Sequence, residues 1–217
     1  MKKILTLMAA IIFVFAAQRS LAQPEIYSTS GGEMLFQFSE VNSLPTNMRW
    51  TVFLHLGNYT HVDFNNNVGA YTGLALRNVG FIADDGPEKL IVRTYNLGVP
   101  LAVKVGMFDK QLYVFGGGEY EWLFHYKEKS WPSGNGDRDG EKTKYTEWFS
   151  SRVNALMPSI FFGVELPRGL NVKYKMYLGN YMNENNTTNI GSRSLDAHLS
   201  YLSLSWNIPH SSFKTTD

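Results

Sequence analysis

The chain has 217 residues, no cysteine, and 20 basic against 19 acidic side chains, for a formal charge of +1. This balance gives no support to nucleic-acid binding by phosphate neutralisation, and the missing cysteines exclude thiol catalysis, disulfides, cysteine-ligated zinc and a lipid-modified cysteine. A mean hydropathy of −0.21 is unlike that of a helical membrane protein. The 19 glycines and the 14% of aromatic residues favour β structure.

The first 22 residues have the three parts of a secretory signal peptide. A basic start at Lys2 and Lys3 precedes an apolar stretch over 4–17, and Ser20-Leu21-Ala22 forms a small-x-small cleavage site. A membrane anchor is the alternative, but the apolar stretch is shorter than the roughly 20 residues that a spanning helix needs. We therefore expect a signal peptide over 1–22, an exported protein, and one mature domain over 23–217.

The rest of the chain alternates apolar and polar residues with period 2, which is typical of β-strands. The clearest case runs from 111 to 127, where Tyr120, Trp122 and Tyr126 share one face while Glu119 and Glu121 share the other. The same pattern predicts eight strands, near 32–39, 49–57, 67–82, 90–106, 111–128, 150–166, 170–182 and 193–208. Residues 107–110 and 167–169 are expected to be tight turns. The stretches 58–66, 83–89, 129–149 and 183–192 are expected to be longer connections.

Strands of this length with one apolar face predict an all-β fold, a closed antiparallel eight-stranded transmembrane β-barrel, so we expect residues 23–217 to form one outer-membrane β-barrel domain. Its polar faces would point inward, where charges of opposite sign would pair across a narrow lumen: Arg77, Lys104, Lys173 and Lys175 with Glu119, Glu121 and Glu165. Aromatic residues near strand ends would form the interfacial girdles: Trp50, Tyr59, Tyr95, Tyr126, Tyr181 and Trp206. The alternative is a soluble periplasmic barrel that binds a small ligand, with the apolar face inside.

Three segments add a family resemblance: YTGLALRNVGF at 71–81, RTYNLGVP at 93–100 and FGGGEY at 115–120. With the strand pattern, they make the chain resemble the small outer-membrane β-barrel proteins of Gram-negative bacteria. The resemblance implies an outer-membrane location, contact with lipid and lipopolysaccharide, and recognition by the barrel assembly machinery. Many such barrels end on an aromatic residue that this machinery reads. Here Trp206 and Phe213 are the candidates, because residues 207–217 follow Trp206.

One candidate catalytic group lies in the last predicted strand. Asp196, His198 and Ser200 share a face, and a His next to a Ser can activate a hydroxyl for acyl transfer. The His-x-Ser pattern is similar to that of outer-membrane lipid A deacylases, so a lipid-modifying hydrolase is an alternative function. The favoured interpretation is a polar strand end facing the headgroup region or a local bulge, and no catalytic residue is assigned.

A second candidate lies at 135–141, where oxygen-bearing residues alternate before Gly140 as in a calcium loop. The glutamate expected at its twelfth position is replaced by Thr146, which favours a solvated loop instead. His55, His61, His125 and His210 have no ligand spacing. No metal or cofactor site is therefore expected.

These patterns predict an integral outer-membrane protein without enzymatic activity, whose role is structural or depends on binding at the cell surface. The segment 129–149 is the predicted binding loop, with Trp131, Tyr145 and Trp148 as its anchors. Eight strands leave an interior about filled by side chains, so a wide diffusion pore is not expected.

Overall fold

The computed structural model describes residues 24–42, 44–86, 88–132, 138, 140–183 and 194–209, and most of these residues are in β-strands. No helix among these residues is long and apolar enough to cross a membrane. The strands are β1 (Glu25–Val41), β2 (Thr46–Asn47), β3 (Arg49–Thr51), β4 (Leu56–Asp63), β5 (Val68–Asp85), β6 (Glu88–Met107), β7 (Leu112–Trp131), β8 (Thr143–Trp148), β9 (Leu156–Leu166), β10 (Leu170–Tyr177) and β11 (Ala197–Pro209).

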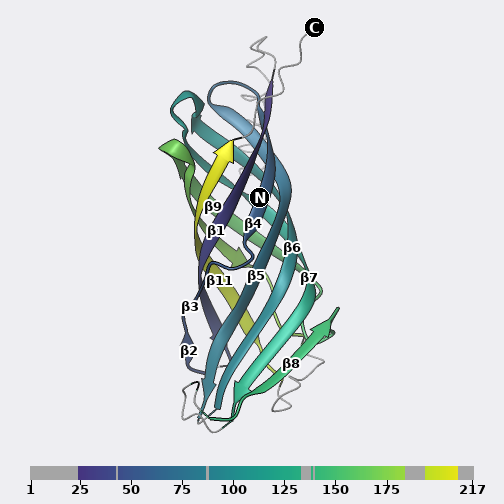
Figure 1. The fold of residues 1–217 in the computed structure, drawn as a ribbon. Helices are drawn as coiled ribbons and strands as arrows, with labels where there is room; N and C mark the ends of the chain where they lie inside the picture. The colour runs from purple at the N-terminus through teal and green to yellow at the C-terminus, as the bar shows by residue number, and fades with distance from the viewer. Residues whose placement is uncertain are drawn as a thin grey trace, which may run out of the picture.

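Eight of these strands form one closed antiparallel ring (Figure 1), in the order β11, β10, β9, β7, β6, β5, β4, β1. The ring closes because β1 pairs with β11 over a continuous register from Thr29↔Pro209 to Val41↔Ala197. The predicted eight-stranded barrel is thereby confirmed. The short strands β2, β3 and β8 pair with β5, β1 and β7.

The two ends of the barrel differ. One end, called the turn end here, has the short connections: the four residues 64–67 and two 3-10 turns, Phe108–Lys110 and Pro167–Gly169. The other, the loop end, has the longer connections after β1, β7 and β10, together with the tight turn between β5 and β6. Two predicted connections were wrong. Most of 58–66 belongs to β4, and most of 83–89 belongs to β5 and β6, which leaves only residues 86–87 between those strands.

The predicted strand 49–57 is broken in the structure. Leu54 has φ +58°, a left-handed conformation that a β-strand does not allow, so the chain turns between β3 and β4. As a result, β4 pairs with β5 only up to Leu56↔Leu76, and β2 resumes pairing with β5 at Asn47↔Ile82. Between these two points the wall has a seam, where no strand pairs with residues 77–81 of β5 on this side.

Side chains bridge this seam where backbone pairing is missing. Gln37 donates to the carbonyl of Asn78 (3.1 Å) and accepts from the amide of Gly80 (2.8 Å). The guanidinium of Arg49 donates to the same carbonyl (3.1 Å) and to the Asn78 side chain (2.6 Å), while His55 Nδ1 accepts from the Asn78 amide (3.2 Å). A wall buried in lipid must satisfy its backbone polar groups internally, and these three side chains do so for the amide and carbonyl of Asn78 and for the amide of Gly80.

A β-bulge divides β7. Its register with β6 shifts at Tyr95/Asn96, so that Tyr95 pairs with His125 while Asn96 pairs with Leu123, and Phe124 is the extra residue. Beyond the bulge the inward and outward positions exchange, because the side-chain period of a strand is 2. The distal part of β7 then pairs with β8 from His125↔Trp148 to Ser130↔Thr143, which extends the wall into a hairpin at the loop end (Figure 1).

Candidate functional site: a filled lumen and an outer surface

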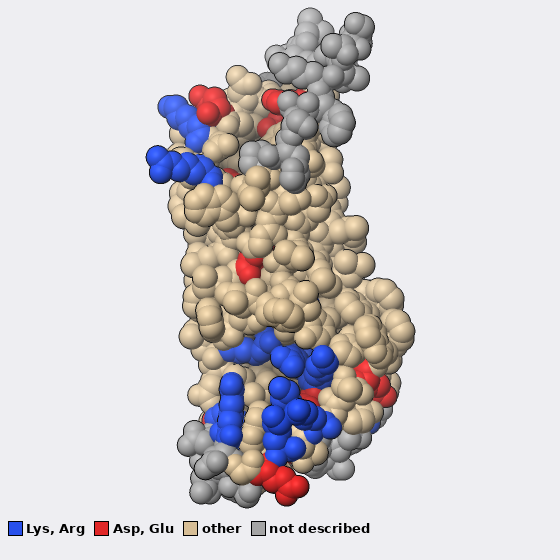
Figure 2. Space-filling model, viewed as in Figure 1, with Lys and Arg blue, Asp and Glu red and all other residues tan. Residues whose placement is uncertain are grey.

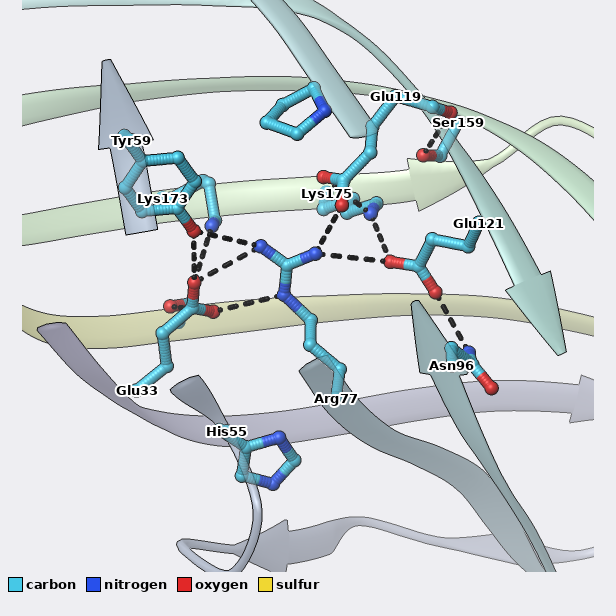
Figure 3. Close-up of polar contacts among 12 residues, drawn as sticks. Glu33, His55, Tyr59, Arg77, Asn96, Glu119, Glu121, Ser159, Lys173 and Lys175 are labelled. Atoms are coloured by element: carbon cyan, nitrogen blue, oxygen red, sulfur yellow. Dashed lines mark hydrogen bonds and ion pairs between the residues drawn. The ribbon is translucent and has the colours of Figure 1, made fainter. Parts of the chain in front are cut away.

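The middle of the lumen contains a layer of buried charges centred on Arg77 of β5 (Figure 3). Its guanidinium contacts Glu33 of β1 at 3.1 Å and Glu121 of β7 at 3.3 Å, and it also binds Glu119. Lys173 of β10 lies 3.1 Å from Glu33, and Lys175 binds Glu119 at 2.9 Å and also Glu121. Three cations therefore balance three carboxylates.

Neutral groups complete the hydrogen bonding of this charged layer. Tyr59 donates to Glu33 at 3.1 Å, and Glu121 accepts from Tyr177 at 2.6 Å and from Asn96 at 2.7 Å. Paired and fully hydrogen-bonded charges are the form in which ionised groups are tolerated in a protein interior. The layer therefore fills the lumen without leaving a free charge to attract an ion.

The predicted pairing of lumen charges is confirmed for Arg77 and Lys175 with Glu119 and Glu121. Lys173 and Lys104 are paired as well, but with Glu33 and Asp63 instead of the predicted carboxylates. The prediction is wrong for Glu165, which accepts hydrogen bonds from the amides of Asn171 (2.7 Å) and Asn207 (3.0 Å) instead of binding a cation. Glu33 and Asp63 are the acidic partners that sequence reasoning missed.

Towards the turn end, Lys104 of β6 forms a second polar layer. Its ammonium lies 2.5 Å from Asp63 and 2.6 Å from the hydroxyl of Tyr27. It also lies 4.5 Å from the ring centre of Phe108 and 5.1 Å from that of Tyr113, in cation–π contact. Aromatic rings and one ion pair therefore occupy this part of the lumen.

Towards the loop end the interior is apolar. Inward side chains of the strands pack with residues of the loop-end connections in one buried cluster: Leu35, Val79, Phe81, Leu90, Val92, Leu123, Tyr126, Val153, Met157, Tyr181, Met182, Leu195 and Leu199. An antiparallel bridge between Val153 and Met182 holds two of these connections over the mouth of the barrel. This end is packed like the core of a soluble protein.

The space left between the charged layer and the turn end is very small. A cavity of about 20 Å³ lies between Glu33, Lys173, Tyr71 and Phe115, among other residues. That volume is about enough for one water molecule. The described part of the barrel is thus filled along its axis, as expected for eight strands.

The outer surface has the opposite character. Large apolar side chains are exposed around the wall: Leu74, Leu97, Val99, Leu101, Val103, Val105, Val114, Tyr120, Leu156, Ile160, Phe162, Leu170, Met176 and Trp206. Figure 2 shows the same band, nearly free of charged groups, between two ends where Lys, Arg, Asp and Glu gather. Apolar side chains outside and charges inside are the reverse of a soluble barrel.

The order of residues along β7 matches the passage from lipid hydrocarbon to headgroups. Along β7, from the apolar band towards the loop end, Tyr120 and Trp122 come first. A group of stacked rings follows, and then Lys127 and Lys129. Trp122 stacks on Phe149 with ring centres 5.6 Å apart, and Phe124 stacks on Trp148 at 6.0 Å. Aromatic residues at the interface, followed by cations, are typical of a membrane boundary.

The predicted girdle is confirmed in part. Trp50 and Trp206 are exposed on the outer wall. Tyr59 and Tyr181 point inward, where they donate to Glu33 and to the carbonyl of Val79. Tyr126 also points inward, because the bulge at Phe124 reverses the faces of β7, and Tyr95 is outward but covered by His125 at 5.4 Å between ring centres.

The predicted hydrolase group does not form an activated hydroxyl. Asp196 and His198 are exposed on the outer side of β11 and lie 3.4 Å apart. The structure gives no hydrogen bond between His198 and Ser200. The shared face was predicted correctly, but a histidine that does not contact the serine cannot remove its proton in this arrangement.

Both ends of the predicted binding loop 129–149 are β structure, because residues 129–131 belong to β7 and residues 143–148 form β8. Trp131 ends β7 and is buried, and Tyr145 lies within β8 beside Tyr126, with ring centres 6.4 Å apart. Of the three predicted anchors only Trp148 is well exposed. The calcium-loop candidate lies mostly outside the described residues, as do His210 and Phe213. No group of three potential metal-ligating side chains occurs within the part of the chain that the structure describes.

The closed ring, the apolar outer band and the neutralised lumen define an eight-stranded transmembrane β-barrel of the outer-membrane type. Among solved structures, the chain resembles OprG of Pseudomonas aeruginosa, with 10% identity over 85% of this chain and 96% of that chain and a TM-score of 0.39. It also resembles CarO of Acinetobacter baumannii (12% identity, 87% and 99% covered, TM-score 0.38). A third similar structure is Ail of Yersinia pestis, solved with the heparin analogue sucrose octasulfate (11% identity, 86% and 100% covered, TM-score 0.34).

No family model matches the sequence, and no curated protein matches it. At these identities and TM-scores the resemblances add no functional argument. The architecture rests on the strand pairing and on the two faces of the strands.

Proposed function

We propose that this protein is an integral outer-membrane barrel, closed to solutes and without enzymatic activity, that acts by binding at its loop end. The observation that supports the closed lumen is the balanced layer of Glu33, Arg77, Glu119, Glu121, Lys173 and Lys175, with an apolar layer next to it. By analogy with other such barrels, whose short turns are periplasmic, the loop end faces the cell exterior. Residues 1–22 would direct the export.

Membrane location is tested by cell fractionation. The protein should sediment with outer membranes, require detergent for extraction, and migrate faster on a gel when it is not heated. In planar bilayers it should show no steady open-channel conductance. A protein that is soluble in periplasmic extract without detergent would overturn the membrane proposal, and a steady conductance would overturn the closed lumen.

The β7–β8 hairpin supports binding at the loop end. Within the described residues β8 pairs only with β7, so its other edge is a short edge strand with unpaired backbone groups. Such an edge can pair with an extended segment of another chain. The hairpin is therefore the part of the loop end that we propose for contact with an extracellular partner.

Loop replacement tests this binding. Residues 133–149, which include β8 and its free edge, are replaced by a Gly-Ser linker of equal length, and the matched control replaces residues 184–193, between β10 and β11, in the same way. Cells displaying each protein are compared for adhesion to an array of immobilised extracellular proteins and glycans. Adhesion should be lost only in the first variant, and equal adhesion by both variants would contradict the proposed role of the hairpin.

A further inference from the structure

A second open space lies on the outside of the barrel at the loop end, along the seam between β3 and β5. It has a volume of about 520 Å³ and is lined by residues of β3, β5, β6 and β7, including Arg49, Trp50, Arg93, Lys129 and Trp131. The hollow follows from the broken strand pairing, because β3 lies beside β5 here without joining its ladder.

The lining of this hollow is strongly basic. Arg49, Arg93 and Lys129 line it together with Arg138, and no carboxylate among the described residues does so. Neither Arg93 nor Lys129 has an ion-pair partner within the described chain. Burial, and then the charges of Arg93, Lys142 and Lys144, lower the pKa of Lys129. Cations that repel one another in this way are stabilised by a bound anion.

The position of the hollow indicates which anion is available. Arg93 pairs with Lys127, and Lys129 pairs with Ile91 and Lys144, so these cations lie beyond the Trp122 and Trp148 rings that mark the edge of the apolar band. Figure 2 shows Lys and Arg atoms gathered at this end. Trp50 and Trp131 give the hollow aromatic walls, which suit the faces of sugar rings.

We infer that this hollow binds the phosphate groups of a glycolipid headgroup in the surrounding outer leaflet. The inference rests on the proposed membrane location. Arg93 and Lys129 contact the phosphates, and Trp50 and Trp131 contact the sugars. Arg49 adds positive charge while its guanidinium remains bonded to Asn78. The bound lipid thereby covers the seam from the outside.

The test compares two double variants that remove the same charge from the same region. Arg93→Gln with Lys129→Gln removes two lining cations, whereas Lys127→Gln with Lys144→Gln removes two nearby cations that do not line the hollow. Each detergent-purified protein is titrated with lipopolysaccharide and with enzymatically dephosphorylated lipopolysaccharide. Heat-modifiable gel migration of every variant verifies the folded barrel, so a failure of the barrel proposal is seen separately.

Lipopolysaccharide should bind the first variant roughly thirtyfold more weakly than wild type, as expected for the loss of two direct charge-assisted contacts with phosphate. The control variant should stay within about threefold of wild type, and wild type should bind the dephosphorylated form as weakly as the first variant binds the intact form. If inorganic pyrophosphate displaces bound lipopolysaccharide, the phosphate groups alone are sufficient for binding. If pyrophosphate does not displace it, binding also requires the sugar linked to the lipid. The inference would be overturned by equal losses of affinity in both variants, or by undiminished binding of the dephosphorylated form. It would also be overturned if polyglutamate displaced the lipopolysaccharide and pyrophosphate did not.

Discussion

Arg77 of β5 binds Glu33 of β1 in a two-pronged contact across the lumen, with Nη2 3.1 Å from Oε1 and Nε 3.3 Å from Oε2. Both side chains are buried. The contact joins two strands that do not pair with each other, next to the Leu56↔Leu76 pair where the seam begins.

Replacing Arg77 with Gln should lower the free energy of unfolding by about 3–5 kcal/mol, because three carboxylates would then share two lysines in a buried site. The measurement is urea unfolding in detergent micelles, followed by tryptophan fluorescence. Adding Glu119→Gln restores charge balance and should recover part of the loss. A single variant as stable as wild type would show that the buried charges do not depend on one another.

The glycine triplet of β7 offers a matched pair of substitutions. A Cβ on Gly117 would lie 2.0 Å from the carbonyl oxygen of Leu101 and 2.7 Å from the Cα of Ala102, whereas a Cβ on Gly118 would meet only the carbonyl of Ser159 at 3.6 Å. Gly117→Ala should therefore destabilise the barrel by about 1–3 kcal/mol, and Gly118→Ala should have little effect. Equal unfolding midpoints for the two variants would mean that β6 does not approach β7 at Gly117 as closely as these distances indicate.

Gln37→Leu tests the seam. The change removes both the donor to the Asn78 carbonyl and the acceptor for the Gly80 amide, at a cost of about 1–3 kcal/mol for each group left unpaired. The Gly80 amide should exchange with deuterium faster than in wild type. Asn58→Ala serves as the control, since Asn58 bonds Ser30 on the exposed face. Unchanged exchange at Gly80 in the Gln37 variant would show that another group protects this amide.

The bulge in β7 can be tested by labelling, because the chain has no native cysteine. Single cysteines at Lys127 and Lys129 should react with a water-soluble maleimide on whole cells, and cysteines at Tyr126 and Ser130 should be protected. An uninterrupted strand predicts the reverse pattern, as the alternation from 111 to 127 did. Labelling at Tyr126 and Ser130 alone would place the register shift elsewhere.

The sequence was sufficient to predict the ring of strands and most of the residues on its inner face, because the alternation of apolar and polar residues indicates directly which residues share a side. It was insufficient wherever one residue interrupts that period. Phe124 stands in an aromatic run with Tyr120, Trp122 and Tyr126, so an inserted residue leaves no mark in the pattern. The left-handed turn at Leu54 is hidden in the same way, among alternating apolar residues.

The missed acidic residues have separate causes. Glu33 shares its face with Leu35 and Gln37, so one apolar neighbour conceals a polar inward face. Asp63 falls in a stretch rich in Asn that is typical of a loop. Which cation each carboxylate binds depends on the height of each strand in the ring. The hydrogen-bond register determines that height, and the register cannot be deduced from composition.

The pairing of β1 with β11 also constrains the order of folding. These strands are the first and last of the described wall, so their contact is among the least local in the chain and forms slowly. Until β11 docks, β1 and β10 are open edges, and open edges are not tolerated in hydrocarbon. Closure and entry into the bilayer must therefore be a single late event, and a chain that stops before β11 should never become a membrane protein at all.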